Sequence, residues 1–208
     1  GTGNDSITGS DTDDYIFGDR YNGLSGHSGN QQIRRDSAPN YGHHRNIETY
    51  LVPHYFTDKV TTSLGGNDSI DAGLGNDVVF GDGGNDTISG GIGSDTIDGG
   101  DGHDSISGGD DSDNLSGGIG NDTITAGAGN DTISGGDGKD SIDAGEGDNN
   151  IDAGGDNDTI TSGAGKDTIA AGDGDDSVSA GIGNDFIAAG DGADTVDGGA
   201  GNDSITGG

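Results

Sequence analysis

Aspartate is the residue type whose number and spacing could carry chemistry in this sequence. The chain holds 39 acidic residues against 7 lysines and arginines, and among the acids only Glu48 and Glu146 are glutamates. A short carboxylate stays close to backbone turns, whereas a solvated acidic tail would mix the two acids freely. The excess of aspartate therefore points to carboxylates that are held in turns.

These aspartates belong to a repeat of nine residues. From Ile70 to Ile205, sixteen aliphatic residues stand nine apart without an insertion or deletion. Two residues before each of them stands Asp, with Asn149 as the exception, and four residues before stands Gly, except at Asp111 and Asp156. The unit is G/A-G-x-G-x-D-x-U-x, in which U is aliphatic, and its nine positions are numbered in that order.

The repeats divide the chain into three parts. Residues 1–17 hold two units of the same kind, and residues 63–208 hold the sixteen continuous nonapeptides. Residues 18–62 interrupt them with a different composition, which includes both prolines, four of the five histidines and five of the seven basic residues. Within this insertion we expect an irregular loop over residues 22–46, while residues 47–62 could form a strand or hairpin.

Composition excludes several classes of protein. With 48 glycines, a hydrophobic fraction of 25% and no cysteine, the chain has no material for an ordinary packed core or for thiol chemistry. A formal net charge of −32 repels nucleic-acid phosphates and anionic membranes. We find neither a long apolar run nor a signal segment, so we predict no nucleic-acid partner and no membrane insertion. We expect the sequence to be a segment of a longer or processed protein.

One aliphatic residue in nine, within a glycine-rich unit, excludes a helix and predicts short strands joined by turns. If two units form one coil, alternate aliphatic residues make two facing stacks. Such a core is thin, and sixteen aliphatic side chains cannot offset the entropy lost when 144 residues become ordered. Rows of stacked carboxylates add repulsion, so the turns require a cation.

Carboxylate and turn-carbonyl oxygens are the ligands of a hard divalent cation. Calcium accepts about six to eight oxygens in irregular geometry and fits this set better than magnesium, whereas zinc or copper would require His or Cys. We therefore predict several Ca²⁺ ions. The predicted metal ligands are Asp5, Asp14, Asp68, Asp77, Asp86, Asp95, Asp104, Asp113, Asp122, Asp131, Asp140, Asp158, Asp167, Asp176, Asp185, Asp194 and Asp203.

Over residues 63–206 the repeat resembles the RTX, or haemolysin-type calcium-binding, nonapeptide family. The resemblance implies an all-β fold, a right-handed parallel β-roll or β-solenoid with two repeats per coil, here with an irregular insertion near the N-terminus. It also implies that each ion lies between the turns of repeats n and n+2. Such an ion takes oxygens from both aspartates and from the Gly-x-Gly carbonyls, in pairs that run from Asp68 with Asp86 to Asp185 with Asp203.

Three residues depart from the pattern at its fourth and sixth positions. Asn149 replaces an aspartate, so we expect weaker sites with Asp131 and Asp167 unless the neighbouring Asp148 substitutes for it. Asp111 and Asp156 stand where Gly is expected, which puts the turn geometry there in doubt and predicts local weak points.

Other interpretations of the motifs fit less well. A disordered acidic tail would not keep an unbroken aliphatic row. The EF-hand spacing with its final Glu is missing, and the G-x-G segments are followed by Asp rather than by a third Gly and a helix. The histidines of the insertion occur without an H-E-x-x-H motif and suit a polar loop, and His103 suits an exposed turn.

The sequence leaves several functions open. The first is a calcium-bound structural segment of a secreted or cell-surface repeat protein, such as a surface layer, adhesin or extracellular sheath, with no enzymatic activity of its own. The alternative is the C-terminal RTX secretion and folding domain of an extracellular enzyme or toxin whose catalytic domain lies elsewhere. Ice binding suits it poorly, because only two Thr-x-Thr pairs occur in the roll. The resemblance implies type I secretion followed by folding on calcium outside the cell.

The third position of the unit lies at the tip of each turn and alternates between the two edges of the roll. One edge carries Leu74, Ile92 and Ile182, whereas the other carries mainly Gly and Asp and a single Ile119. We therefore expect that the first edge could support self-association or contact with lattice or filament neighbours.

Overall fold

The computed structural model describes residues 6–8, 15–17 and 66–208. The insertion, with its expected loop and its strand or hairpin, lies outside the described residues. All regular structure in the described part is β-strand, and none of it is a helix that could cross a membrane. The eighteen strands are β1 (Ser6–Thr8), β2 (Tyr15–Phe17), β3 (Ser69–Leu74), β4 (Val78–Phe80), β5 (Thr87–Ile92), β6 (Thr96–Asp101), β7 (Ser105–Asp110), β8 (Asn114–Ile119), β9 (Thr123–Ala128), β10 (Thr132–Asp137), β11 (Ser141–Glu146), β12 (Asn150–Gly155), β13 (Thr159–Thr161), β14 (Thr168–Asp173), β15 (Ser177–Ser179), β16 (Phe186–Ala188), β17 (Thr195–Asp197) and β18 (Ser204–Thr206).

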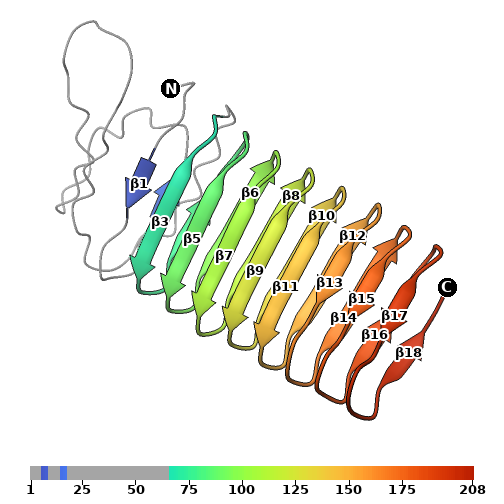
Figure 1. The fold of residues 1–208 in the computed structure, drawn as a ribbon. Helices are drawn as coiled ribbons and strands as arrows, with labels where there is room; N and C mark the ends of the chain where they lie inside the picture. Colours follow the sequence, from blue (N-terminus) through green and yellow to red (C-terminus); the bar gives the residue numbers. More distant parts are fainter. Residues whose placement is uncertain (1–5, 9–14, 18–65) are drawn as a thin grey trace, which may run out of the picture.

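The strands form two parallel sheets of nine strands each. The first sheet contains the odd-numbered strands in the order β1 to β17, and the second contains the even-numbered strands in the order β2 to β18. Consecutive strands therefore lie in opposite sheets, and each strand pairs with the strand two further along the chain (Figure 1). This arrangement confirms the parallel β-roll with two nonapeptides per coil.

The register follows the nonapeptide without slippage. Ile88 aligns with Ile106 in the first sheet, and Ile97 aligns with Leu115 in the second. Every pair along the continuous repeats is thus eighteen residues apart, because two units complete one coil. A slip by one residue would turn each aliphatic side chain to solvent, so the pattern fixes the pairing.

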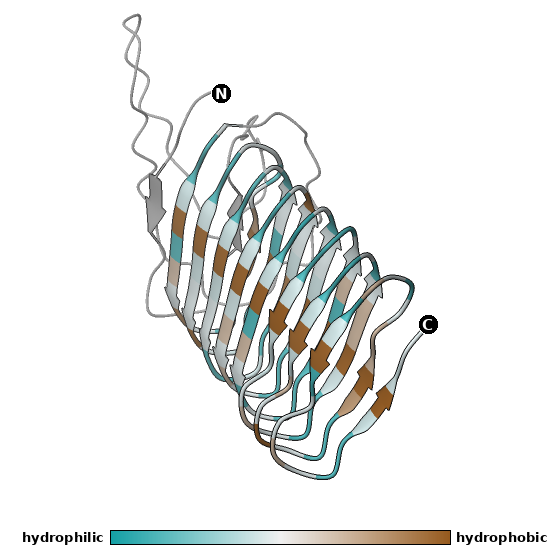
Figure 2. Cartoon of the chain, turned by 45° about the vertical axis from the view of Figure 1, so that its right-hand side comes forward, coloured by the Kyte–Doolittle hydropathy of each residue, from teal (hydrophilic) through white to brown (hydrophobic). Residues whose placement is uncertain are grey.

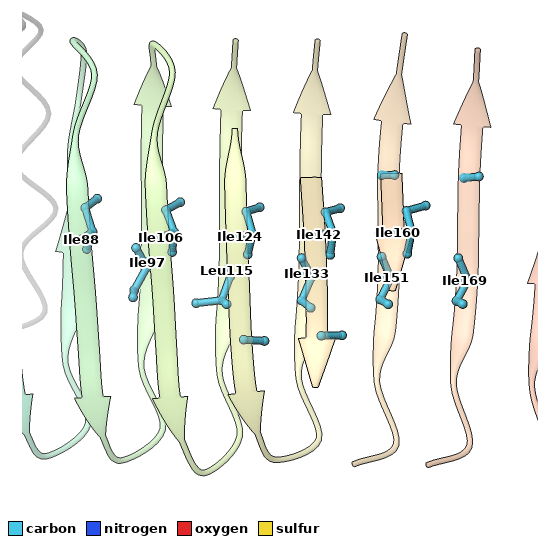
Figure 3. Close-up of a cluster of buried hydrophobic side chains, with 14 of the residues drawn as sticks. Ile88, Ile97, Ile106, Leu115, Ile124, Ile133, Ile142, Ile151, Ile160 and Ile169 are labelled. Atoms are coloured by element: carbon cyan, nitrogen blue, oxygen red, sulfur yellow. The ribbon is translucent and has the colours of Figure 1, made fainter. Parts of the chain in front are cut away.

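The core consists of the two predicted aliphatic stacks, which face each other between the sheets (Figure 3). From Ile70 to Ile187 every aliphatic residue at the eighth position is at most 3% exposed. Hydropathy colouring shows them as an apolar band across the strands, with hydrophilic residues along the turns (Figure 2). Among the coils whose burial the structure describes, the last is the more open one, with Val196 partly buried and Ile205 half exposed.

A second buried row at the first position of the unit was not predicted. It is occupied by small residues alone, and the alanines in it belong to the hydrophobic core. Its members from Ala72 to Ala189 are Gly or Ala, with one serine at Ser162, which is also buried. The sequence signal was the periodic restriction to small residues, which close sheet packing requires.

The fourth position shows why glycine recurs in the turns. Gly120 has a φ of 140°, and a Cβ on it would collide with the carbonyl oxygen of Gly102 in the turn of the previous coil. Successive turns therefore stack backbone on backbone, and a side chain at this position would separate them.

Candidate metal sites

The turns hold two rows of buried aspartates, one along each edge of the roll. Each row takes every second repeat, so its members are eighteen residues apart. In the part of the chain that the structure describes, all sixth-position residues from Asp68 to Asp185 are buried, including Asn149, whereas Asp194 and Asp203 in the last coil are partly exposed. Asp5 and Asp14 lie outside the described residues.

Within each row, one carboxylate oxygen binds the backbone of the neighbouring turn. The backbone N–H of Asp104 donates to Oδ1 of Asp122 at 2.8 Å, and the N–H of Asp122 donates to Oδ1 of Asp140 at 2.9 Å. The same bond recurs from Asp68 through Asp185 at distances of 2.7–3.1 Å. The structure thus brings together the pairs of repeats n and n+2 that the resemblance implied.

In part of each row, the second carboxylate oxygen, Oδ2, lacks such a partner. At eight of these aspartates in the described region, Oδ2 is buried and makes no hydrogen bond: Asp104, Asp113, Asp122, Asp131, Asp140, Asp158, Asp176 and Asp185. A buried anionic oxygen without a donor is costly, and it is normally neutralised by a proton or by a bound cation. These unpartnered Oδ2 atoms show that the aspartates predicted as metal ligands suit a bound cation.

Glycine at the first position leaves a small cradle next to this oxygen. A Cβ built on Gly99 would lie 2.5 Å from Oδ2 of Asp104 and 2.7 Å from the carbonyl oxygen of Gly117. The same convergence of carboxylate and carbonyl oxygens occurs beside Gly117, where Asp122 and Gly135 supply the two atoms. Oxygen atoms that converge in this way are the donor set of a hard cation such as Ca²⁺.

Burial changes the proton affinity of the row. Desolvation raises the pKa of Asp104 to about 6 and that of Asp113 to about 7, against the opposing effect of the backbone hydrogen bond that each accepts. The same cause raises the pKa of Asp140 to about 6 and that of Asp158 to about 7, and the neighbouring carboxylates of the row add to it. The row therefore resists carrying its full negative charge unless positive charge is supplied.

No cluster of three or more His, Cys, Asp or Glu side chains is placed for one metal ion within the described ranges. Each turn pair contributes two sixth-position side chains, so a complete oxygen shell has to include backbone carbonyls. The carbonyl of Gly102 at the fourth position suits this role, because none of the inter-turn backbone hydrogen bonds of the described turns is accepted by it. A mixed shell of carboxylates and carbonyls is typical of calcium and atypical of zinc.

Asn149 occupies the row as its aspartate neighbours do. Its Oδ1 accepts the N–H of Asp131 at 2.9 Å, and its own N–H donates to Oδ1 of Asp167. Its Nδ2, however, is buried without a hydrogen-bond partner, in the place where the other residues present an oxygen. An amide nitrogen cannot ligate a cation, which gives a physical reason for the weaker sites expected here.

Asp111 and Asp156 take the place of glycine without breaking the turn, but the hydrogen bonds beside them are longer than their counterparts elsewhere. Both adopt the left-handed conformation, with φ values of 77° and 73°, which Asp tolerates better than most residues. The adjoining inter-turn hydrogen bonds are long: Gly93 N–H to Asp110 carbonyl measures 3.3 Å and Gly138 N–H to Gly155 carbonyl 3.2 Å. The corresponding bonds at the other described turns measure 2.7–2.9 Å.

A second ladder, at the fifth position, escaped the sequence analysis. The backbone N–H of Asn121 donates to Nδ1 of His103 at 2.7 Å, and the N–H of Lys139 donates to Oδ1 of Asn121 at 3.0 Å. His103, expected only to be exposed, is exposed and also accepts this bond. The recurrence of Asn, Asp and Ser at the fifth position was the available signal, because these side chains cap nearby backbone groups.

The fold and the turns together define a parallel β-roll with calcium-type oxygen sites in its turns. A model of the RTX calcium-binding nonapeptide repeat, in four copies, matches residues 1–20, 64–88, 80–115, 89–124, 116–151, 143–178, 152–187 and 179–208. The chain belongs to this calcium-binding repeat family. Comparison with curated proteins finds none that matches it.

Proposed function

We propose that this chain is a calcium-folded structural roll of a secreted or cell-surface repeat protein, and that it performs no catalysis itself. The observation that carries the proposal is the set of eight buried aspartates named above, whose Oδ2 atoms have no hydrogen-bond donor. Two features support a scaffold: the core is only two side chains deep, and the same pair of carboxylate and carbonyl oxygens recurs beside the first-position glycines between Gly81 and Gly135.

Calcium binding supplies the folding free energy in this proposal. Ions that bind the folded turns and not the unfolded chain shift the equilibrium toward the roll by mass action. Where calcium is scarce, the uncompensated rows of buried carboxylates oppose folding. Extracellular calcium is therefore the folding signal, which suits export of an unfolded chain by a type I system and assembly of a surface layer, adhesin or sheath outside the cell.

The test is a calcium titration followed by far-ultraviolet circular dichroism. The chain in excess chelator is expected to be unfolded, and Ca²⁺ is expected to produce β-structure cooperatively, because each coil contacts only its neighbours. Mg²⁺ at the same concentration is the control and should fail to do so, because it demands a small, regular octahedral shell. An unchanged β-spectrum in excess chelator would refute the proposal.

A further inference from the structure

The first two repeats continue the roll as though residues 18–62 were absent. Strand β1 pairs directly with β3, where Ile7 aligns with Ile70, and β2 pairs directly with β4, where Ile16 aligns with Val79. In the sheet orders no other strand lies between the members of these pairs. These partners are 63 residues apart rather than eighteen, yet 63 is also a whole number of nonapeptides.

The length of the insertion preserves the phase of the repeat. Residues 18–62 are 45 residues, which equals five nonapeptides. If they were removed, Phe17 at the ninth position would be followed by Ser63 at the first. Ile16 and Ile70 would then be nine residues apart, as all their successors are.

After such a deletion, the connection between β2 and β3 would also have the length and sequence of an ordinary turn. Between β2 and β3 it would leave residues 63–68, and the next turn from the second sheet to the first, between β4 and β5, is residues 81–86. Both are six residues long, and both end in Gly-Gly-Asn-Asp. The one unsuitable residue is Leu64, because its counterpart Asp82 has a φ of 68°, a conformation that a leucine rarely adopts.

We propose that residues 18–62 are a separate module inserted in phase into one turn of the roll, and that the roll folds on calcium without them. The module leaves and re-enters at the turn between β2 and β3, on the edge that also carries Gly83 and Asp101. It contributes five of the seven basic residues, four of the five tyrosines and both prolines of the chain, whereas the remaining residues carry 35 of the 39 acids and only two lysines, Lys139 and Lys166. The roll thus presents a segment of different chemistry from a turn whose register does not depend on it.

The test compares three chains: the full chain, a deletion of residues 18–62, and the same deletion with Leu64→Gly. The readout is hydrogen exchange of the backbone amides of Ser6–Thr8 and Tyr15–Phe17 in saturating calcium. Shortening the connection from 51 residues to six should raise the docking equilibrium of the first coil about twentyfold, with a matching rise in amide protection. The proposal is supported if the amides of β1 and β2 are at least as well protected in either deletion variant as in the full chain.

A deletion of residues 18–66 is the out-of-phase control. It leaves two residues, Asn67 and Asp68, where a turn needs six, so β1 and β2 should lose protection while the later strands keep it. If both in-phase deletions lose the protection of β1 and β2, or lose calcium-driven folding, the proposal is overturned. Failure of the full chain itself to fold on calcium would instead refute the proposed function.

Discussion

The backbone N–H of Asp131 donates to Oδ1 of Asn149 at 2.9 Å, so an asparagine maintains the ladder that aspartates form elsewhere in the row. What it lacks is the second oxygen, because Nδ2 fills the buried position without a partner. The hydrogen-bonding and the cation-binding roles of the sixth position are therefore separable, and they can be tested separately.

Asn149→Asp should complete the row and strengthen calcium binding at the sites shared with Asp131 and Asp167. Affinity for calcium rises with the number of charged ligands, so we expect the calcium midpoint of folding to fall. Without calcium the added buried carboxylate should destabilise the roll. Calcium titration followed by circular dichroism measures the midpoint, and a variant that folds at the same calcium concentration as the parent would contradict the assignment.

Asp122→Asn is the converse experiment. The amide keeps the acceptor for the N–H of Asp104 and removes the Oδ2 charge, so the calcium midpoint should rise while the ion-free form gains stability. Asp122→Ala is the matched variant, since it removes the acceptor as well. In saturating calcium it should cost about 1–3 kcal/mol more in unfolding free energy than Asp122→Asn. Equal unfolding free energies for the two variants would show that the ladder bond contributes nothing.

Acid should stabilise the calcium-free roll. Burial raises the pKa of Asp113 and Asp158 to about 7 and that of Asp104 and Asp140 to about 6. In the unfolded chain these carboxyls titrate near 3.8, so between about pH 4 and 7 the folded state binds more protons than the unfolded state. In chelator, the folded fraction of the chain should therefore be larger near pH 4 than near pH 7.

In excess calcium the pH dependence should reverse. Protons compete with the ion for the same oxygens, so acidification should raise the calcium midpoint. Circular dichroism between pH 4 and 8, with chelator and with calcium, tests both slopes. Identical slopes in the two series would argue against the aspartate rows as the shared binding site.

Asp111→Gly and Asp156→Gly should stabilise the roll by about 1 kcal/mol each, because glycine reaches the left-handed conformation without a steric penalty. Relief of the backbone strain in these turns should also strengthen the long hydrogen bonds that the N–H groups of Gly93 and Gly138 donate. Hydrogen exchange of those two amides would report this change. Gly120→Asp is the control in a turn of ordinary geometry, and it should destabilise. If all three substitutions change stability equally, conformation at the fourth position is not the cause.

The apolar edge of the roll should promote lateral association. Leu74, Ile92 and Ile182 are 40%, 50% and 66% exposed on one edge, whereas the other edge has only Ile119 at 57% as a large exposed apolar tip among the described turns. Replacing the first three residues by Ser should reduce assembly in calcium, as measured by light scattering, while Ile119→Ser should not. Unchanged assembly of the triple variant would exclude this edge as the site of lateral association.

The sequence was sufficient to predict the coil, the two aliphatic stacks and the pairing of aspartates from repeats n and n+2. The coil and the stacks follow from the nine-residue period, because a shift in register would expose residues such as Ile106 and Leu115. The pairing of the aspartates was implied by the resemblance to the calcium-binding repeat family. The two side-chain ladders were not predicted, since the pattern of residue types does not say which of its two oxygens Asp122 gives to a backbone N–H. The role of His103 depended in the same way on the spacing of stacked turns.

The doubt about Asp111 and Asp156 was partly justified. A residue with a Cβ was expected to disturb the turn, and the structure shows instead a change of φ that leaves the aspartate row continuous and lengthens one hydrogen bond beside each residue. The sequence cannot show this compromise, because it depends on how far a single turn can rotate while its neighbours keep their stacking.

The aspartate ladder gives the roll a direction. At the sixth position each amide hydrogen is capped by a side chain from the coil that follows, whereas at the fifth position the cap comes from the coil that precedes, as His103 caps Asn121. If the roll is cut between two coils, one new surface displays uncapped sixth-position donors with idle fifth-position acceptors, and the other displays the reverse. Two such pieces can rejoin tail to head, but two identical surfaces cannot replace each other, so the roll is polar along its axis.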